Sequence, residues 1–136
     1  MSISCPEYLI KSAQQGLIQD LRDGIEKYKF SPSSTDSDGC SLLHWAAINN
    51  QLQAVSYLID SGADVNLKGG ILGETPLLWG IRAGSILVVD LLTKKGADLK
   101  LKSSECLDAL QLATRLGNKK FLFNKKVRVM INHLKL

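Results

Sequence analysis

Apolar residues recur along the chain at the spacing of one helix face, in short blocks separated by polar turns. Two blocks contain matching stripes: Val55, Leu58 and Ile59 in the first, and Val88 or Val89, Leu91 and Leu92 in the second. Positions three and four apart lie on the same side of a helix. Each stripe is followed by a glycine, Gly62 or Gly96, a residue type at which helices commonly end. The pattern predicts short amphipathic helices rather than strands.

The blocks repeat with an offset of 34 residues. The repeated positions include Gly39 and Gly73, Leu43 and Leu77, Trp45 and Trp79, and the segments Gly62-Ala63-Asp64 and Gly96-Ala97-Asp98. A period of this length is typical of a solenoid, in which each unit buries its apolar face against its neighbours. The sequence therefore predicts a stack of similar helical units.

The start and end of the predicted helices are also marked in each unit. Thr75 is expected to cap a helix N-terminus and Pro76 to occupy its first position, with Ser41 in the capping role one unit earlier. Asn50 and Gly84 lie where the first helix of each unit must turn, and both residue types tolerate left-handed backbone.

Weaker versions of this pattern flank the two clear units. Residues 6–15 and 17–28 predict a helix pair around Gly16, and the polar residues 31–38 predict a flexible loop. A third, degenerate unit begins at residues 109–113, with Gln111 at the position of His44. An apolar stripe then predicts a closing helix with a basic outer face: Phe123, Val127, Met130, Ile131 and Leu134.

These motifs resemble ankyrin repeats, whose pattern is close to G-x-T-P-L-H-x-A, then V-x-x-L-L, then G-A-D. The resemblance implies an all-α fold, an ankyrin-repeat solenoid of about four stacked helix pairs with hairpin loops. We expect a single domain over residues 1–136. Its parts are an N-terminal capping helix pair at 1–30, repeats at 36–68 and 70–102, and a degenerate repeat with a C-terminal cap at 103–136.

The resemblance also assigns structural roles to the motif residues His44, Thr75, Pro76, Gly62 and Gly96. It implies that His44 bonds the backbone of a neighbouring loop. Leu78 stands where the second unit would have this histidine, so we expect looser hairpin geometry around residues 67–74.

The two tryptophans are expected to be neighbours on successive first helices, because they occupy one repeat position. Asn49 lies one helical turn beyond Trp45 and on the same face. An aromatic wall beside an amide can hold an extended peptide. The alternative is that Trp45 and Trp79 only fill the space between repeats.

A closer resemblance favours the peptide interpretation. The segment L-L-H-W-A-A-I-N-N, followed by T-P-L-L-W, is similar to the ankyrin domain of the huntingtin-interacting DHHC-type palmitoyltransferases. In that family this domain recruits substrates by binding short disordered segments that end in Gln-Pro, through an Asn and a Trp. The matching positions here are Asn49 and Trp79, with Trp45 beside them. The usual T-P-L-H-W is altered at Leu78.

These observations support two alternative hypotheses for the function. The first is a non-catalytic protein–protein interaction module that recognises a short peptide, or a partner protein, as in the substrate-recruiting domain of palmitoyltransferases. The alternative is a stand-alone ankyrin adaptor or effector that binds a folded partner through hairpin tips such as residues 68–72.

Charge adds a third hypothesis. The net charge is +4, but residues 1–93 hold six basic and ten acidic side chains, whereas residues 94–136 hold eleven and three. A basic C-terminal helix can contact an anionic membrane surface. Exposed aromatics between the basic residues are lacking, so nucleic acid is not expected as the main partner, and a solvated cap is the simpler explanation.

The sequence offers little for catalysis. It contains no Asp-His-His-Cys motif, no zinc-ligand array, and no apolar run near the ~20 residues of a membrane helix. We therefore expect no enzyme activity, metal or cofactor in these residues. Cys5, Cys40 and Cys106 show no C-x-x-C spacing and suit a reducing compartment. The expected form is a cytoplasmic monomer, on the cytosolic face of the Golgi or other endomembranes if the chain is part of a DHHC enzyme.

Overall fold

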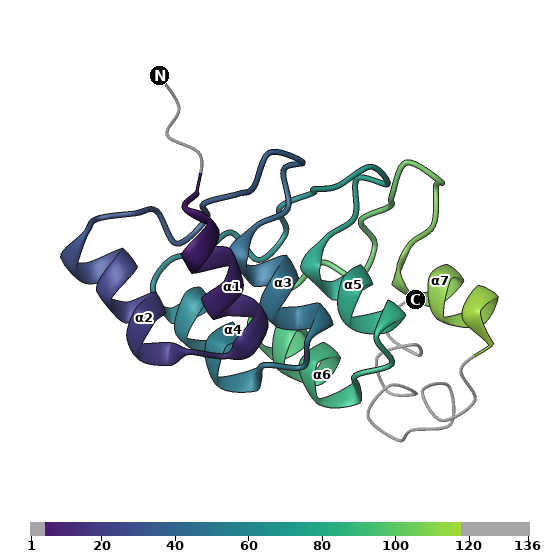
Figure 1. Cartoon of the computed structure of the whole chain (residues 1–136). Coiled ribbons are helices and arrows are strands. Elements are labelled where there is room, and N and C mark those ends of the chain that lie inside the picture. The colour runs from purple at the N-terminus through teal and green to yellow at the C-terminus, as the bar shows by residue number, and fades with distance from the viewer. Residues whose placement is uncertain (1–4, 118–136) are drawn as a thin grey trace.

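The computed structural model describes residues 5–117, which form a row of helices in two layers (Figure 1). One layer contains α1 (Glu7–Gln15), α3 (Leu42–Ile48), α5 (Pro76–Arg82) and α7 (Ala109–Leu116). The other contains α2 (Ile18–Arg22) with the π-helical turn η1 (Asp23–Lys27), then α4 (Leu52–Asp60) and α6 (Ile86–Lys94). Within these residues the extended segments form only isolated bridges, Thr35 with Ser41 and Gly69 with Glu74.

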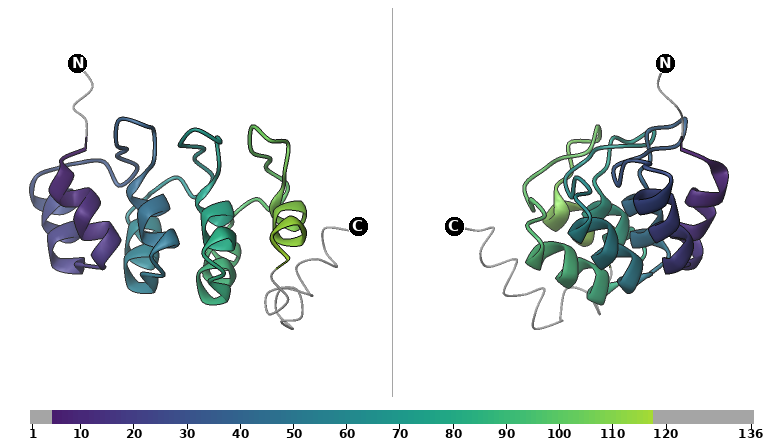
Figure 2. Two further views of the ribbon diagram at one scale, coloured as in Figure 1. Left: turned by 45° about the vertical axis from the view of Figure 1, so that its right-hand side comes forward. Right: turned by 90° about the vertical axis from the view of Figure 1, so that its left-hand side faces the viewer.

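Successive helix pairs stand side by side, and their connecting hairpins project from the same end of the stack (Figure 2). This arrangement confirms the all-α solenoid predicted from the repeats. The predicted closing helix, with its apolar stripe from Phe123 to Leu134 and its basic face, lies outside the described residues.

The core lies between repeats and is built from the predicted stripes. Val55 and Leu58 of α4 and Val88, Val89 and Leu92 of α6 are buried. They pack with the buried first-helix residues, which include Leu42, Leu43, Ala46, Ala47, Leu77 and Ile81. Small residues on the first helices allow neighbouring repeats to approach closely, which sets the spacing of the stack.

The helix starts are capped as the sequence predicts. The Ser41 hydroxyl accepts the His44 backbone N–H at 3.2 Å, and the Thr75 hydroxyl accepts the Leu78 N–H at 3.4 Å. Pro76 occupies the first turn of α5, and Asn50 turns the chain after α3 with a φ of 57°. These expectations are confirmed.

The N-terminal pair differs from the prediction in one respect. The second helix is not regular over residues 17–28, because α2 passes into the wider turn η1, where the Tyr28 N–H bonds the Asp23 carbonyl at 2.9 Å. Gly24 in this turn is buried, and a Cβ there would overlap the Leu9 side chain of α1. Asp23 in this turn and Tyr28 directly after it line a cavity at the N-terminal end of the stack.

The expectation of a looser hairpin at residues 67–74 is wrong. His44 reaches forward and bonds the Glu74 carbonyl at 2.6 Å, so this hairpin keeps its bond from the preceding repeat. Gly69 and Glu74 also exchange two backbone hydrogen bonds of 3.0 Å. Leu78 occupies the position of His44 one repeat later and has no polar side-chain atom. The missing bond is therefore the one from α5 to the next hairpin, which precedes α7.

Candidate peptide-binding groove

Trp45 on α3 and Trp79 on α5 lie side by side, as their common repeat position predicts. Their ring centroids are 5.2 Å apart with an angle of 86° between the planes. This edge-to-face contact is one of the preferred arrangements of aromatic pairs. The indole N–H of Trp45 donates to Asp36 at 2.9 Å, which fixes that ring against the preceding loop.

Trp79 is held from a second side by His44. The His44 ring stands edge-on to it, with centroids 5.0 Å apart and an interplanar angle of 72°. Both tryptophans nevertheless remain partly exposed. They therefore fill space between repeats and also present aromatic surface to solvent.

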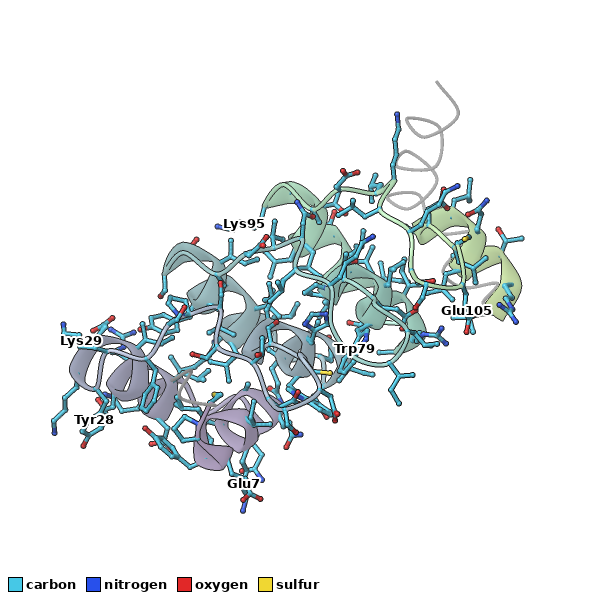
Figure 3. All side chains as sticks on the ribbon, turned by 90° about the horizontal axis from the view of Figure 1, so that it is seen from above. Glu7, Tyr28, Lys29, Trp79, Lys95 and Glu105 are labelled. Carbon is cyan, nitrogen blue, oxygen red and sulfur yellow. The ribbon has the colours of Figure 1, made fainter. Side chains whose placement is uncertain are left out.

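That surface forms one wall of an open groove of about 420 Å³. Trp45, Trp79 and Ile48 supply its apolar side, and the hairpin residues 69–72 lie opposite. Trp79 lies near the middle of the row of repeats when the molecule is viewed from the hairpin end (Figure 3). The groove thus spans two repeats, between the first helices and the hairpins.

Two glycines allow the hairpin to lie close to the tryptophans. A Cβ on Gly69 would overlap the Gly39 carbonyl oxygen, so only glycine lets these two hairpins pack together. Gly70 adopts a φ of 77°, and a Cβ there would stand 3.6 Å from the Trp79 ring. Because these glycines have no side chains, the hairpin leaves room beside the tryptophan rings.

An ion pair between the buried Glu74 and the more exposed Arg82 forms part of the groove lining. Arg82 Nε bonds both carboxylate oxygens of Glu74, at 2.7 and 2.9 Å. The Glu74 side chain is 3% exposed and that of Arg82 31%. The hydrogen bond to Glu74 raises the pKa of Arg82, so the guanidinium remains charged. Its position at the surface suits contact with a carbonyl or carboxylate of a ligand.

Asn49 lies beside this groove rather than in its lining. Its amide nitrogen donates to the Trp45 carbonyl at 2.8 Å, and the side chain is exposed. The side-chain oxygen accepts no hydrogen bond within residues 5–117. Ile48, Glu74 and Arg82, which line the groove, were not identified from the sequence, although Ile48 and Arg82 share a repeat position 34 residues apart.

Cys40 also lines the groove but is a poor nucleophile. Burial, with the nearby charges of Asp36 and Asp38, raises the pKa of its thiol to about 11. Burial also lowers the pKa of His44, which is fully engaged in bonds to Ser41 and Glu74. Within residues 5–117 no group of three or more His, Cys, Asp or Glu side chains has the arrangement of a metal site.

The helices within the described residues are all too short or too polar to cross a membrane. The family described as ankyrin repeats (3 copies) matches residues 8–103. The match covers both complete repeats, the N-terminal pair and all residues of the groove.

The chain is also similar in sequence to several palmitoyltransferases. The chain is 41% identical over 110 residues to Palmitoyltransferase AKR1 of Kluyveromyces lactis, which covers 79% of the chain and 14% of the relative. It is 39% identical over 105 residues to human Palmitoyltransferase ZDHHC13, covering 77% and 17%. For Palmitoyltransferase ZDHHC17 of Danio rerio the identity is 39% over 97 residues, covering 71% and 16%. The chain thus spans about a sixth of the length of these relatives.

Proposed function

This chain belongs to the ankyrin-repeat family, and from that premise we propose that it is a non-catalytic module that binds a short extended peptide in the groove beside Trp79. The observation that carries the proposal is the open apolar wall of Trp45, Trp79 and Ile48 facing a glycine-containing hairpin. Such a wall accepts an aliphatic or proline side chain, and the polar groups at its edges orient the peptide backbone.

Asn49 and Arg82 supply that orientation from two sides. The Asn49 side-chain oxygen accepts a peptide N–H, while its amide nitrogen stays bonded to Trp45. Arg82 is held by Glu74 through Nε, so its terminal N–H groups are available to donate to a peptide carbonyl. The favoured ligand carries an aliphatic pair followed by Gln-Pro, in keeping with the resemblance to palmitoyltransferase ankyrin domains.

The relatives suggest a setting for this module. They are named palmitoyltransferases, and the chain matches only a small part of their length. We propose that the module recruits protein substrates for such an enzyme on the cytosolic face of a membrane. In that setting the basic residues after 93 would lie near anionic lipid headgroups.

Binding of a fluorescent peptide that contains an aliphatic pair and ends in Gln-Pro tests the proposal. We expect Trp79→Ala to weaken binding by about tenfold or more, since buried tryptophans are frequent hot spots. Asn49→Ala should weaken it by about threefold to tenfold through one lost hydrogen bond. Leu87→Ala, an exposed apolar change on α6, is the matched control and should bind like the wild type.

Because Trp79 also packs between repeats, its variant is checked by circular dichroism and thermal melting. Asn49 is exposed, so its variant keeps the fold and tests the groove independently. Equal binding by wild type and Asn49→Ala, together with equal binding by a folded Trp79→Ala, would contradict the proposal.

One observation favours the alternative of a folded partner. Ile71 at the tip of the hairpin is 96% exposed, so nearly all of its aliphatic side chain is open to contact with a partner. If the tip is the interface, Ile71→Ser abolishes partner binding while Asn49→Ala leaves it unchanged. Because Ile71 also lines the groove, loss of binding in Asn49→Ala is the result that supports the groove.

A further inference from the structure

A second concave surface lies at the N-terminal end of the stack, away from the groove. It has a volume of about 700 Å³ and is lined by Tyr8, Asp20, Asp23, Tyr28 and Phe30. These side chains come from α1, α2, η1 and the segment that follows η1. Figure 3 shows Tyr28 at one end of the molecule and Trp79 near its middle, so the two sites are separate.

The aromatic rings of this cavity are unusually open to solvent. Tyr8 is 46% and Tyr28 57% exposed, and both are among the exposed large side chains of residues 5–117. The ammonium of Lys27 stands 5.3 Å from the centre of the Tyr28 ring. This contact shows that the ring is placed to attract a cation, because the face of an aromatic ring carries negative partial charge.

The cavity also presents two carboxylates. Within residues 5–117 the Asp20 carboxylate makes no hydrogen bond or ion pair, and Asp23 accepts one hydrogen bond, from Gln19 at 2.9 Å. Partial burial, the neighbouring Tyr28 and Cys5, and then Asp20 and Asp23 raise the pKa of Tyr8, which is consistent with a negative potential at this place. Unpaired acidic groups beside open rings favour a cationic ligand.

We propose that this cavity binds the guanidinium of an arginine side chain presented by a partner protein. A guanidinium is planar and weakly hydrated, so it stacks on the faces of Tyr8 and Tyr28, and its five N–H groups satisfy both carboxylates. A quaternary ammonium carries no N–H donor and gives Asp20 and Asp23 no hydrogen bond from the ligand. A lysine ammonium is more strongly hydrated and stacks less well.

The proposal does not depend on the groove. None of the five residues that line this cavity lines the groove beside Trp79. A partner that binds both sites gains avidity from the second contact, since the first binding event raises the local concentration at the second. Mutations can still remove binding at each site separately.

Nuclear magnetic resonance titration with acetyl-Gly-Arg-Gly-amide tests the proposal. We expect saturable shifts of the backbone signals of Tyr8, Asp20 and Tyr28, with much smaller shifts for the citrulline peptide, which is neutral and of the same shape. The double variant Asp20→Asn with Asp23→Asn, and Tyr28→Ala alone, should each weaken binding by about fivefold or more. Glu7→Gln removes one acidic charge on α1 outside the cavity and is the matched control.

Lys27→Gln should change the affinity for arginine in the opposite direction. It removes the cation that stands over Tyr28, so arginine binding should become stronger. Equal shifts with the citrulline peptide would overturn the proposal. Tighter binding of a third peptide, with trimethyl-lysine in place of the arginine, would also overturn it. Shifts at Tyr8 and Tyr28 that depend on protein concentration without peptide would assign the cavity to a second copy of the chain instead.

Discussion

His44 joins two repeats through both of its ring nitrogens. The Ser41 backbone N–H can only donate, so the Nδ1 that receives it at 3.1 Å is unprotonated. The Glu74 carbonyl can only accept, so Nε2 at 2.6 Å carries the proton. One neutral tautomer therefore satisfies the start of α3 and the hairpin of the next repeat, with the ring completely buried.

Replacement of His44 by alanine should cost about 2–4 kcal/mol of unfolding free energy, since it removes the bonds of both ring nitrogens, to the Ser41 N–H and the Glu74 carbonyl, and opens a cavity. Gln111→Ala is the control, because Gln111 holds the same capping position on α7 but is exposed. Its cost should be about 1 kcal/mol or less. Urea unfolding followed by circular dichroism measures both, and equal costs would contradict the bridging role of His44.

The buried histidine also makes stability depend on pH. Burial lowers the pKa of His44 in the folded state, so the unfolded chain binds the proton more readily. Stability is therefore unaffected above the unfolded pKa of about 6.5 and falls as the pH drops below it. Urea midpoints between pH 7.5 and pH 5 should fall in the wild type and fall less in His44→Gln. A parallel decline in both proteins would exclude His44 as the cause.

In the second and third units an ion pair connects the hairpin to the helix that follows it. Glu74 ends the hairpin and Arg82 ends α5, so their ion pair connects the two ends of the unit. Arg115 and Glu105 form a similar pair at 2.8 Å in the third unit, but there both side chains are exposed. Burial of Glu74 makes the first pair the stronger connection.

Loss of the cation beside the buried acid should therefore cost more than loss of the cation beside the exposed one. We expect Arg82→Ala to lower the unfolding free energy by about 2–3 kcal/mol, since it leaves the buried Glu74 carboxylate without its positive partner. Arg115→Ala should lower it by less than about 1 kcal/mol, because its partner Glu105 is exposed. Both are read from urea unfolding. If the two variants differ by less than experimental error, the pair does not stabilise the hairpin as described.

The elements were largely predictable from the sequence because local signals mark them. Ser41, Thr75 and Asn50 act within one turn of themselves, and the period of 34 residues fixes which helices are neighbours. The effect of Leu78 was expected one hairpin too early, at residues 67–74, because a pattern within one unit does not show which neighbour a side chain faces.

The sites were less predictable, because a pattern within one unit does not show which residues of neighbouring segments come together. Trp45 and Trp79 stand out because they repeat, whereas the pairing of Glu74 with Arg82 depends on how the hairpin folds back over α5. The cavity at Tyr8 and Tyr28 has no repeating equivalent and depends on the wider turn η1. No periodicity in the sequence indicates such a turn.

Across the whole molecule, the two proposed sites lie at different places along the stack, as Tyr28 and Trp79 show (Figure 3). The groove spans the second and third helix pairs, and the acidic aromatic cavity occupies the first. The excess of basic residues begins only after residue 93. The peptide recognition proposed for the groove therefore rests on aromatic surface and hydrogen bonds, not on the net charge of the chain.

The two indole N–H resonances test the central claim most directly, because the chain contains only two tryptophans. A nitrogen-15 labelled sample is titrated with the Gln-Pro peptide, and Trp45→Phe assigns the two signals. A ligand in the groove should shift the Trp79 signal in a saturable way, while the Trp45 signal moves less because its N–H stays bonded to Asp36. If the peptide binds and neither indole signal moves, the groove is not the recognition site.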